Sequence, residues 1–383
     1  MFTLDDDERV ITETAAAFAD KRIAPHALEW DASKHFPTDV LREAAGLGMA
    51  AIYCREDVGG SGLRRLDGVR IFEQLAIADP VTAAFLSIHN MCAWMIDSFG
   101  TEEQRKGWVP RLASMDVIAS YCLTEPGAGS DASALSTRAV RQGDDYVLDG
   151  VKQFISGAGA SDVYVVMART GGEGPRGIST FVIEKDTPGL SFGAMEEKMG
   201  WHAQPTAQVI LEGVRVPADA MLGGADGEGT GFGIAMSGLN GGRLNIAACS
   251  LGGAQSALDK SLAYMKERKA FGKRLDEFQA LQFRLADMAT ELEAARTFLW
   301  RAAAALDRKD VSATQLCAMA KRFGTDVGFE VANQALQLFG GYGYLSEYGI
   351  EKIVRDLRVH QILEGTNEIM RVIVARSLVG DNR

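Results

Sequence analysis

The sequence has no apolar run long enough to cross a bilayer, which takes about 18–20 residues, although 47% of its 383 residues are hydrophobic. It also lacks a basic or Arg- and Ser-rich leader, because residues 1–8 read Met-Phe-Thr-Leu-Asp-Asp-Asp-Glu. Targeting and secretory segments require such basic regions. We therefore expect no membrane span and no targeting segment, and we predict a cytoplasmic protein.

The cysteines and histidines lack the spacing of metal ligands. The five cysteines are odd in number and scattered, and the five histidines form no HExxH pattern. Closely spaced pairs of these residues are the usual signature of a zinc site. We therefore expect no bound metal and a set of reduced thiols: Cys54, Cys92, Cys122, Cys249 and Cys317.

Positive charge is also in deficit, since the formal net charge is −11 and the pI is near 5.1. Nucleic acids and anionic membranes attract basic surfaces, so this charge argues against either as the main partner. The length is sufficient for two or three domains with a substantial core.

The pattern of apolar, β-branched and turn-forming residues changes twice along the chain. Ala-rich amphipathic stretches up to about residue 119 predict helices, and short β-branched runs separated by turn signals over 120–228 predict an antiparallel sheet or barrel. From 229 to 383, apolar stripes with the spacing of bundle helices return, such as Leu281, Leu285 and Met288. The sequence therefore predicts an α+β protein with three domains, over 1–119, 120–228 and 229–383.

One carboxylate near the C-terminus is the first candidate for catalysis. Glu364 follows Ile362 and Leu363, precedes Gly365 and has no adjacent cation. Burial among apolar residues moves the pKa of a carboxyl towards neutrality, where a general base works best. Such a base can remove a weakly acidic C–H proton. The alternative interpretation is an acidic residue in the first turn of a C-terminal helix.

A glycine-rich motif over 121–132 has the formal G-x-G-x-x-A shape of a dinucleotide fingerprint, with Gly127 and Gly129. That fingerprint needs a long helix directly after it, and the residues that follow favour another strand instead. We therefore reject a Rossmann site. The loop is better suited to a flat, polar-edged cofactor, with Thr124 and Ser130 as hydrogen-bond donors, and 152–159, with Phe154, offers a second wall.

Two further segments have a functional and an ordinary interpretation. Arg268 and Arg243 each lie where they can contact a phosphate, although most surface arginines are only solvated. Gln337 begins a run with three glycines in four positions, 340–343, that is typical of a helix C-terminus and also allows close approach of a ligand.

Taken together, these segments resemble the acyl-CoA dehydrogenase family from end to end. Residues 121–131 look like the flavin signature of that family, and 337–343 and 364–368 look like its second signature and its catalytic segment. The resemblance implies an N-terminal helical domain, a central β-barrel and a C-terminal four-helix bundle. It also implies FAD as cofactor, an acyl-CoA substrate, an electron-transfer flavoprotein as electron acceptor, and a homotetramer.

The resemblance assigns roles to matching positions. Glu364 would abstract the α-proton of the acyl-CoA thioester, while hydride passes from the β-carbon to the flavin. Its backbone N–H would contact the thioester oxygen, a bond that stabilises the developing enolate. The other implied flavin contacts within the chain are Tyr121, Leu123, Thr124, Gly129, Ser130, Phe154, Ile155, Ser156, Thr366 and Glu368. The implied contacts to the flavin of a neighbouring subunit are Arg268, Phe271, Phe278, Gln279, Gln337, Leu338, Gly340 and Gly341. The implied CoA-ester contacts are Ser130, Asn240, Gly241, Gly242, Arg243 and Arg371.

Family members that place the base elsewhere carry a glutamate on the helix position of Gly242 and a small residue at position 364. Here Gly242 and Glu364 have the opposite arrangement, which excludes that subclass. The segment Gly200-Trp201-His-Ala-Gln-Pro-Thr206 and the run 238–247 imply a short branched substrate, with isobutyryl-CoA of valine catabolism as the first choice. Butyryl-CoA and 2-methylbutyryl-CoA are the alternatives. A flavin oxidase or a non-catalytic flavoprotein on the same scaffold also stays open.

Overall fold

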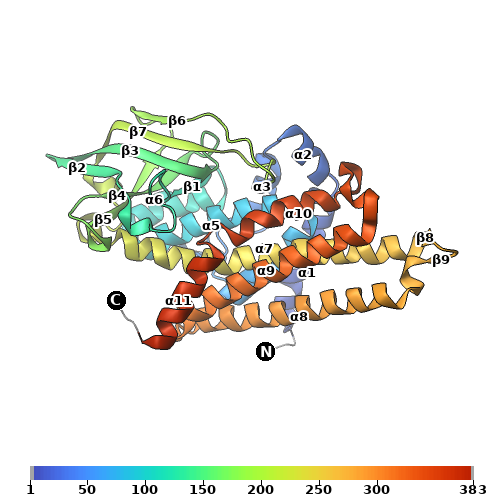
Figure 1. Ribbon diagram of the computed structural model, residues 1–383. Coiled ribbons are helices and arrows are strands. Elements are labelled where there is room, and N and C mark those ends of the chain that lie inside the picture. Colours follow the sequence, from blue (N-terminus) through green and yellow to red (C-terminus); the bar gives the residue numbers. More distant parts are fainter. Residues whose placement is uncertain (1–3, 381–383) are drawn as a thin grey trace.

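The structure is a computed structural model that describes residues 4–380, in which a helical part, a β-sheet and a second helical part follow one another (Figure 1). This order and the three-domain fold confirm the sequence prediction. α1 begins with a capping box, in which the Asp5 side chain accepts a hydrogen bond from the Glu8 N–H at 2.8 Å. The N-terminal helices are α1 Asp6–Phe18, α2 Ala27–Ser33, α3 Thr38–Ala45, α4 Arg65–Ala78, α5 Pro80–Phe99 and α6 Glu102–Ala113.

The central part is a seven-stranded sheet with the order β1-β4-β2-β3-β7-β6, in which β5 also pairs with β4. β3 and β7 are the longest strands, and they pair antiparallel with two register shifts. The strands are β1 Ala119–Cys122, β2 Arg138–Gln142, β3 Asp145–Ser156, β4 Val163–Arg169, β5 Ile178–Glu184, β6 Leu190–Phe192 and β7 Thr206–Pro217.

The expectation of a purely antiparallel sheet was wrong, because β1 runs parallel to β4 and β2 also pairs with β4 in parallel, at Arg138 and Arg169. A parallel pair needs a long connection, and here the connection contains the whole β2–β3 hairpin. The loop that leaves β1 therefore does not turn straight back into a hairpin with its neighbour in the sheet.

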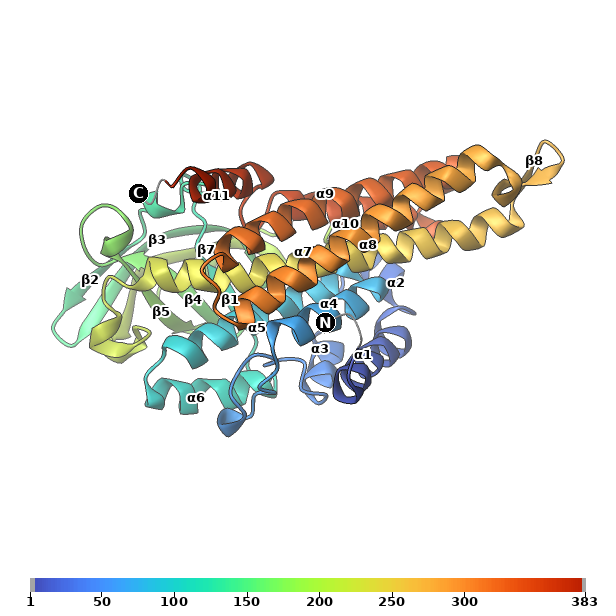
Figure 2. The same ribbon diagram turned by 90° about the horizontal axis from the view of Figure 1, so that it is seen from below.

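The C-terminal part is built on three long helices, α7, α8 and α9. α7 has 37 residues, which corresponds to about 55 Å at 1.5 Å per residue, and it runs from below the sheet to a small hairpin at the far tip of the molecule (Figures 1 and 2). No helix within residues 4–380 combines the length and the apolar character of a membrane span. The elements are α7 Gly231–Glu267, β8 Lys269–Ala270, β9 Lys273–Arg274, α8 Gln279–Asp307, α9 Ala313–Phe339, α10 Ile350–Arg358 and α11 Asn367–Val379.

The apolar stripe that predicts α8 is also the face that the helix buries. Met288, Leu292 and Leu299 are each at most 4% exposed, and each such side chain contributes about 1.5–3 kcal/mol by leaving water. The same continuous core includes residues of α4, α5, α7 and α9, so the two helical parts share one interior. Apolar side chains of the strands themselves form a separate core.

A buried ionic cluster joins all three parts of the molecule. The Lys352 ammonium on α10 donates to Asp79, the N-cap of α5, at 2.6 Å and to Asp356 at 2.7 Å. Asp356 also accepts the backbone N–H of Trp201, from the segment between β6 and β7, at 2.6 Å. Lys352, Asp79 and Asp356 are all at most 3% exposed. Their charges are therefore stabilised by one another and by these hydrogen bonds instead of by water.

We expect Lys352→Met to lower the free energy of unfolding by about 3–5 kcal/mol, because it leaves two buried carboxylates without their cation. Urea unfolding at pH 7 measures this loss. The control is Lys106→Met, which removes an exposed ion pair with Glu102 and should change stability by less than about 1 kcal/mol. Equal effects of the two substitutions would contradict the role assigned to the cluster.

Candidate functional site

A cleft of about 690 Å³ lies where the β-sheet meets helices α5, α7 and α11. One wall is the loop after β1 together with the end of β3, and the opposite side is formed by α7 and the 363–365 turn that precedes α11. The cleft thus draws on all three parts of the chain. It is lined by ten residues of the predicted site: Tyr121, Leu123, Thr124, Gly129, Ser130, Phe154, Ile155, Ser156, Arg243 and Glu364.

Glu364 is the ionisable group of greatest chemical interest in the cleft. Its Oε2 is buried and has no hydrogen-bond partner among residues 4–380. Burial raises the pKa of the Glu364 carboxyl to about 7, against the opposing effect of the positive charges on Arg243 and Lys321. A carboxylate with this pKa is well matched to proton abstraction near neutral pH.

The backbone at Glu364 is held in an unusual conformation. Its φ of +56° and the φ of +85° at Gly365 are both left-handed, a region that costs an L-residue with a side chain about 1–3 kcal/mol. The carbonyl oxygen of Glu364 accepts from Arg243 Nε at 3.3 Å, and that of Gly365 accepts from Lys321 Nζ at 2.8 Å. Thr366 then caps α11 by accepting the N–H of Ile369 at 3.3 Å.

The Glu364 carboxylate lies directly against α7 at Gly242. A Cβ on Gly242 would stand 2.6 Å from Oε2, 2.8 Å from Cδ and 2.9 Å from Oε1 of that carboxylate. Real Cβ atoms do not approach other atoms this closely. A side chain at position 242 and this placement of the Glu364 carboxylate therefore exclude each other.

The glycine-rich loop after β1 is fixed from beneath by a buried ion pair. Lys152 on β3 donates to Glu125 at 2.7 Å and to the Leu123 carbonyl at 3.1 Å. Burial alone would raise the pKa of the Glu125 carboxyl. The charge and the hydrogen bond of Lys152, together with hydrogen bonds from Thr137 and Ser136, instead lower this pKa to about 2. The loop therefore presents its hydroxyls and amides to the cleft from a rigid base.

The segment between β6 and β7 supplies a further wall. Trp201 is 5% exposed, has a φ of +58°, and lines the cleft. Gln204 donates to the Ser156 hydroxyl at 3.0 Å. The Trp201 Nε1 and the Tyr121 hydroxyl, like Glu364 Oε2, are buried without a partner in the described chain. Three orphaned polar atoms along one cleft fit a ligand that carries donors and acceptors along its edge.

Several predicted residues lie away from this cleft. Arg268, Gln337, Leu338, Gly340 and Gly341 line a second depression of about 380 Å³, where the C-terminal ends of α7 and α9 meet. The tip nearby carries Phe271, which is 95% exposed and lies edge-on to Phe278, followed by Gln279, the first residue of α8. Figure 1 shows that this tip is at the opposite end of the long helices from the sheet.

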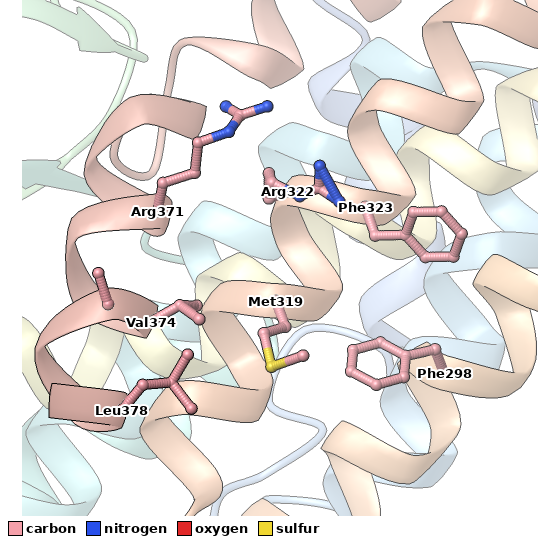
Figure 3. Close-up of a pocket in the computed structure, with 8 residues that line it drawn as sticks. Phe298, Met319, Arg322, Phe323, Arg371, Val374 and Leu378 are labelled. Carbon is pink, nitrogen blue, oxygen red and sulfur yellow. The ribbon is translucent and has the colours of Figure 1, made fainter.

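Of the predicted CoA contacts, Arg371 does not reach the cleft. It lies beside a shallow apolar depression between α11, α8 and α9, with Arg322 across from it (Figure 3). Its guanidinium is 3.5 Å from Asp326 and 3.8 Å from Glu368. The arginine of α11 that lines the cleft is Arg376, because five residues turn a helix by about 140°.

Other predicted residues adjoin the cleft without lining it. Asn240 accepts from Arg243 Nη1 at 2.8 Å and so orients that guanidinium. Gly241 packs against Arg65, whose Nη1 would be 2.3 Å from a Cβ there. The side chain of Glu368 is 80% exposed. Within residues 4–380, no His, Cys, Asp and Glu side chains cluster as metal ligands.

Sequence reasoning missed Lys321 and Arg376, and it connected Trp201 with substrate choice without placing it in the cleft wall. The signal for Lys321 was its position on α9 in register with Cys317 and Gly324, small residues that are buried. A lysine on such a face must find partners, since it is 0% exposed. No comparable signal distinguishes Arg376 from Arg371 before the rotation of α11 is known.

Comparison with known proteins gives matches along nearly the whole chain. Residues 5–116, 120–214 and 229–379 match the N-terminal, middle and C-terminal domains of acyl-CoA dehydrogenase. A mitochondrial isobutyryl-CoA dehydrogenase from Dictyostelium discoideum is 57% identical over 380 residues, which is 99% of this chain and 91% of that protein.

Two solved structures extend the likeness to three dimensions. Butyryl-CoA dehydrogenase from Megasphaera elsdenii is 39% identical with a TM-score of 0.95, over 99% of this chain and 100% of that one. A glutaryl-CoA dehydrogenase from Mycobacterium smegmatis in complex with FADH2 is 30% identical with a TM-score of 0.92, over 98% and 95% of the two chains. The three matched domains, in order and at this identity, show that the chain belongs to the acyl-CoA dehydrogenase family.

Proposed function

We propose that the protein is an FAD-dependent dehydrogenase of short α-branched acyl-CoA thioesters, with isobutyryl-CoA as its preferred substrate and Glu364 as its base. The observation that carries the proposal is the buried, unpartnered carboxylate of Glu364 in a cleft shared by all three domains. The identity of 57% with an isobutyryl-CoA dehydrogenase supports the choice of acyl group.

The residues around the cleft fit FAD. Phe154 is 64% exposed at the cleft and offers an aromatic face, while Thr124, Ser156 and Trp201 Nε1 offer donors along an edge. The glutaryl-CoA dehydrogenase in complex with FADH2 has the same fold and supports this assignment. FAD, when bound, supplies the acceptor for the hydride that leaves the substrate β-carbon.

The chain itself supplies the base and the surroundings of the thioester. The Glu364 carboxylate takes the α-proton, so that the α and β C–H bonds break as the double bond forms. The backbone N–H of Glu364 donates no hydrogen bond within the described chain and is available to the thioester oxygen, where it stabilises negative charge. We assign Ser130, Arg243 and Arg376 to the CoA side of the cleft, in place of Arg371.

The second depression suggests that the site is completed by another copy of the chain. Arg268 and Gln337 lie at the C-terminal ends of α7 and α9, and Phe278 directly precedes α8 near the same tip, far from the cleft of their own chain. We propose that they contact FAD held by a neighbouring copy in a homotetramer.

An electron-transfer flavoprotein is the proposed electron acceptor. Comparing the rate of turnover with such a protein with the rate of oxygen consumption distinguishes a dehydrogenase from an oxidase.

We expect Glu364→Gln to lower kcat by about 10²–10⁴-fold, because the amide accepts no proton, while the yellow colour of bound flavin persists. In the unchanged protein, kcat/KM should rise with pH up to about 7, since only the ionised carboxylate acts as a base and burial raises the pKa of Glu364 to about 7. Stopped-flow flavin reduction over pH 5–9 measures both. Turnover by the variant within threefold of the parent would show that another group is the base.

We expect Gly242→Ala to lower kcat by about 10²-fold, because the added methyl displaces the Glu364 carboxylate and a 1 Å misplacement has this effect. The matched control is Gly233→Ala on the same helix, where a Cβ meets nothing within 4 Å. Steady-state kinetics on both variants should show loss only at position 242. Unchanged turnover in Gly242→Ala would mean that the carboxylate occupies a different place during the reaction.

We expect isobutyryl-CoA to give the highest kcat/KM, with butyryl- and 2-methylbutyryl-CoA lower and isovaleryl- and octanoyl-CoA poor. One methyl group in an apolar pocket discriminates by about 10–200-fold, so some activity on neighbouring substrates should remain. A panel of the five thioesters with a common acceptor measures the order. A tenfold preference for butyryl-CoA over isobutyryl-CoA would place the protein in the straight short-chain group.

A further inference from the structure

The catalytic turn is held by hydrogen bonds that do not involve the carboxylate itself. Glu364 and Gly365 have φ values of +56° and +85°, and a left-handed conformation at a glutamate persists only where its surroundings impose it. The feature that imposes it therefore decides where the Glu364 side chain points.

Lys321 contacts this turn from α9. Its side chain is fully buried, and Nζ donates to the Gly365 carbonyl at 2.8 Å and to Asn367 Oδ1 at 2.9 Å. Asn367 in turn donates to Asp326 at 2.7 Å and to the Thr325 hydroxyl at 3.0 Å, both on α9. One face of α9 thus holds the residues directly after Glu364 through a continuous set of hydrogen bonds.

A second cation binds the turn from another helix. Arg243 on α7 donates to the carbonyl of Glu364 at 3.3 Å, so two successive carbonyls are bound by cations from two different helices. Neither cation donates to Oε2 of Glu364, which has no partner among residues 4–380. The ammonium of Lys321 therefore orients the backbone while the carboxylate stays free to accept a proton.

We propose that Lys321 is a positioning residue for the base, which holds the turn at Gly365 and Asn367 so that the Glu364 carboxylate projects past Gly242 into the cleft. The inference rests on the proposed function in one point, namely that Glu364 is the base. It adds a residue that makes no contact with substrate or cofactor to the set on which the reaction depends.

The charge of Lys321 has a second effect on the same carboxyl. Burial lowers the pKa of Lys321 to about 7, and the charge of Glu364 opposes this shift. The other charged groups that face Lys321 are Arg243 on α7, Asp326 on α9 and Glu368 on α11. Because the ammonium lowers the pKa of Glu364, its removal should move the pH profile of the base to higher pH.

Three variants separate the hydrogen bond from the charge. Lys321→Met removes both, and Lys321→Gln keeps an amide donor for the Gly365 carbonyl but carries no charge. Arg322→Met is the matched control, since Arg322 is the next residue of α9 and faces the shallow depression instead of the cleft (Figure 3). The measurements are kcat, KM, the pH midpoint of kcat/KM, and exchange of the substrate α-hydrogen with D2O on prereduced enzyme.

For Lys321→Met we expect kcat to fall by about 10- to 100-fold with KM changed by less than about threefold, because the base is displaced and binding groups are not. Exchange of the α-hydrogen should fall in parallel, and the pH midpoint should rise by about one unit. Lys321→Gln should recover part of kcat while keeping the raised midpoint. Arg322→Met should retain kcat and midpoint.

The proposal is overturned if Lys321→Met lowers only the melting temperature and leaves kcat and the pH midpoint unchanged. Should Lys321→Met fail to fold, Lys321→Gln with unchanged kcat, unchanged exchange of the α-hydrogen and an unshifted midpoint overturns it equally. Loss of the proposed function itself has another signature, since turnover that survives in Glu364→Gln removes Glu364 as base whatever Lys321 does.

Discussion

The site depends on burying one carboxylate without giving it a hydrogen-bond partner. A buried, unpaired carboxyl lowers stability, and the fold must therefore enclose Glu364 through contacts made elsewhere. α7 leaves room for it at Gly242, whose missing Cβ would otherwise stand 2.6 Å from Oε2. The turn carrying it is bound at successive carbonyls by Arg243 and Lys321. The carboxylate thus remains basic because the surrounding cations bind the backbone instead.

Buried lysines recur wherever the walls of the cleft must keep their relative position. Lys352 joins α5, α10 and the Trp201 segment through two aspartates, and Lys152 fixes the glycine-rich loop through Glu125. Each lysine has at least one carboxylate or carbonyl at 2.6–2.8 Å. An ion pair of this kind tolerates little displacement, because either partner left alone in the interior is strongly unfavourable. These buried lysines therefore fix the relative positions of the three domains.

Much of this arrangement was available from the sequence. The order of helical and β segments followed from periodicity, and Glu364 stood out because it had apolar neighbours and no adjacent cation. The parallel pairing of β1 with β4 was missed, because strand runs and turn signals do not specify which strands become neighbours. Arg371 was named and Arg376 was not, because sequence similarity does not show which face of α11 lines the cleft. Lys321 was missed because a lysine among small residues becomes informative only once that face is known to be buried.

The length of α7 sets the distance between two distant parts of the fold. Gly242 adjoins the base of its own chain, and Arg268, at the C-cap of the same helix, lines the second depression. Arg268 follows Gly242 by 26 positions, which corresponds to about 40 Å of helix, and each residue added or removed would shift one end by about 1.5 Å and rotate it by about 100°. If Arg268 contacts the FAD of a neighbouring copy, the length of this helix sets the distance between two active sites. An insertion or deletion within α7 would then change both the distance between the two ends and the direction in which their side chains point. The number of residues in α7 is therefore constrained by the geometry of the assembly.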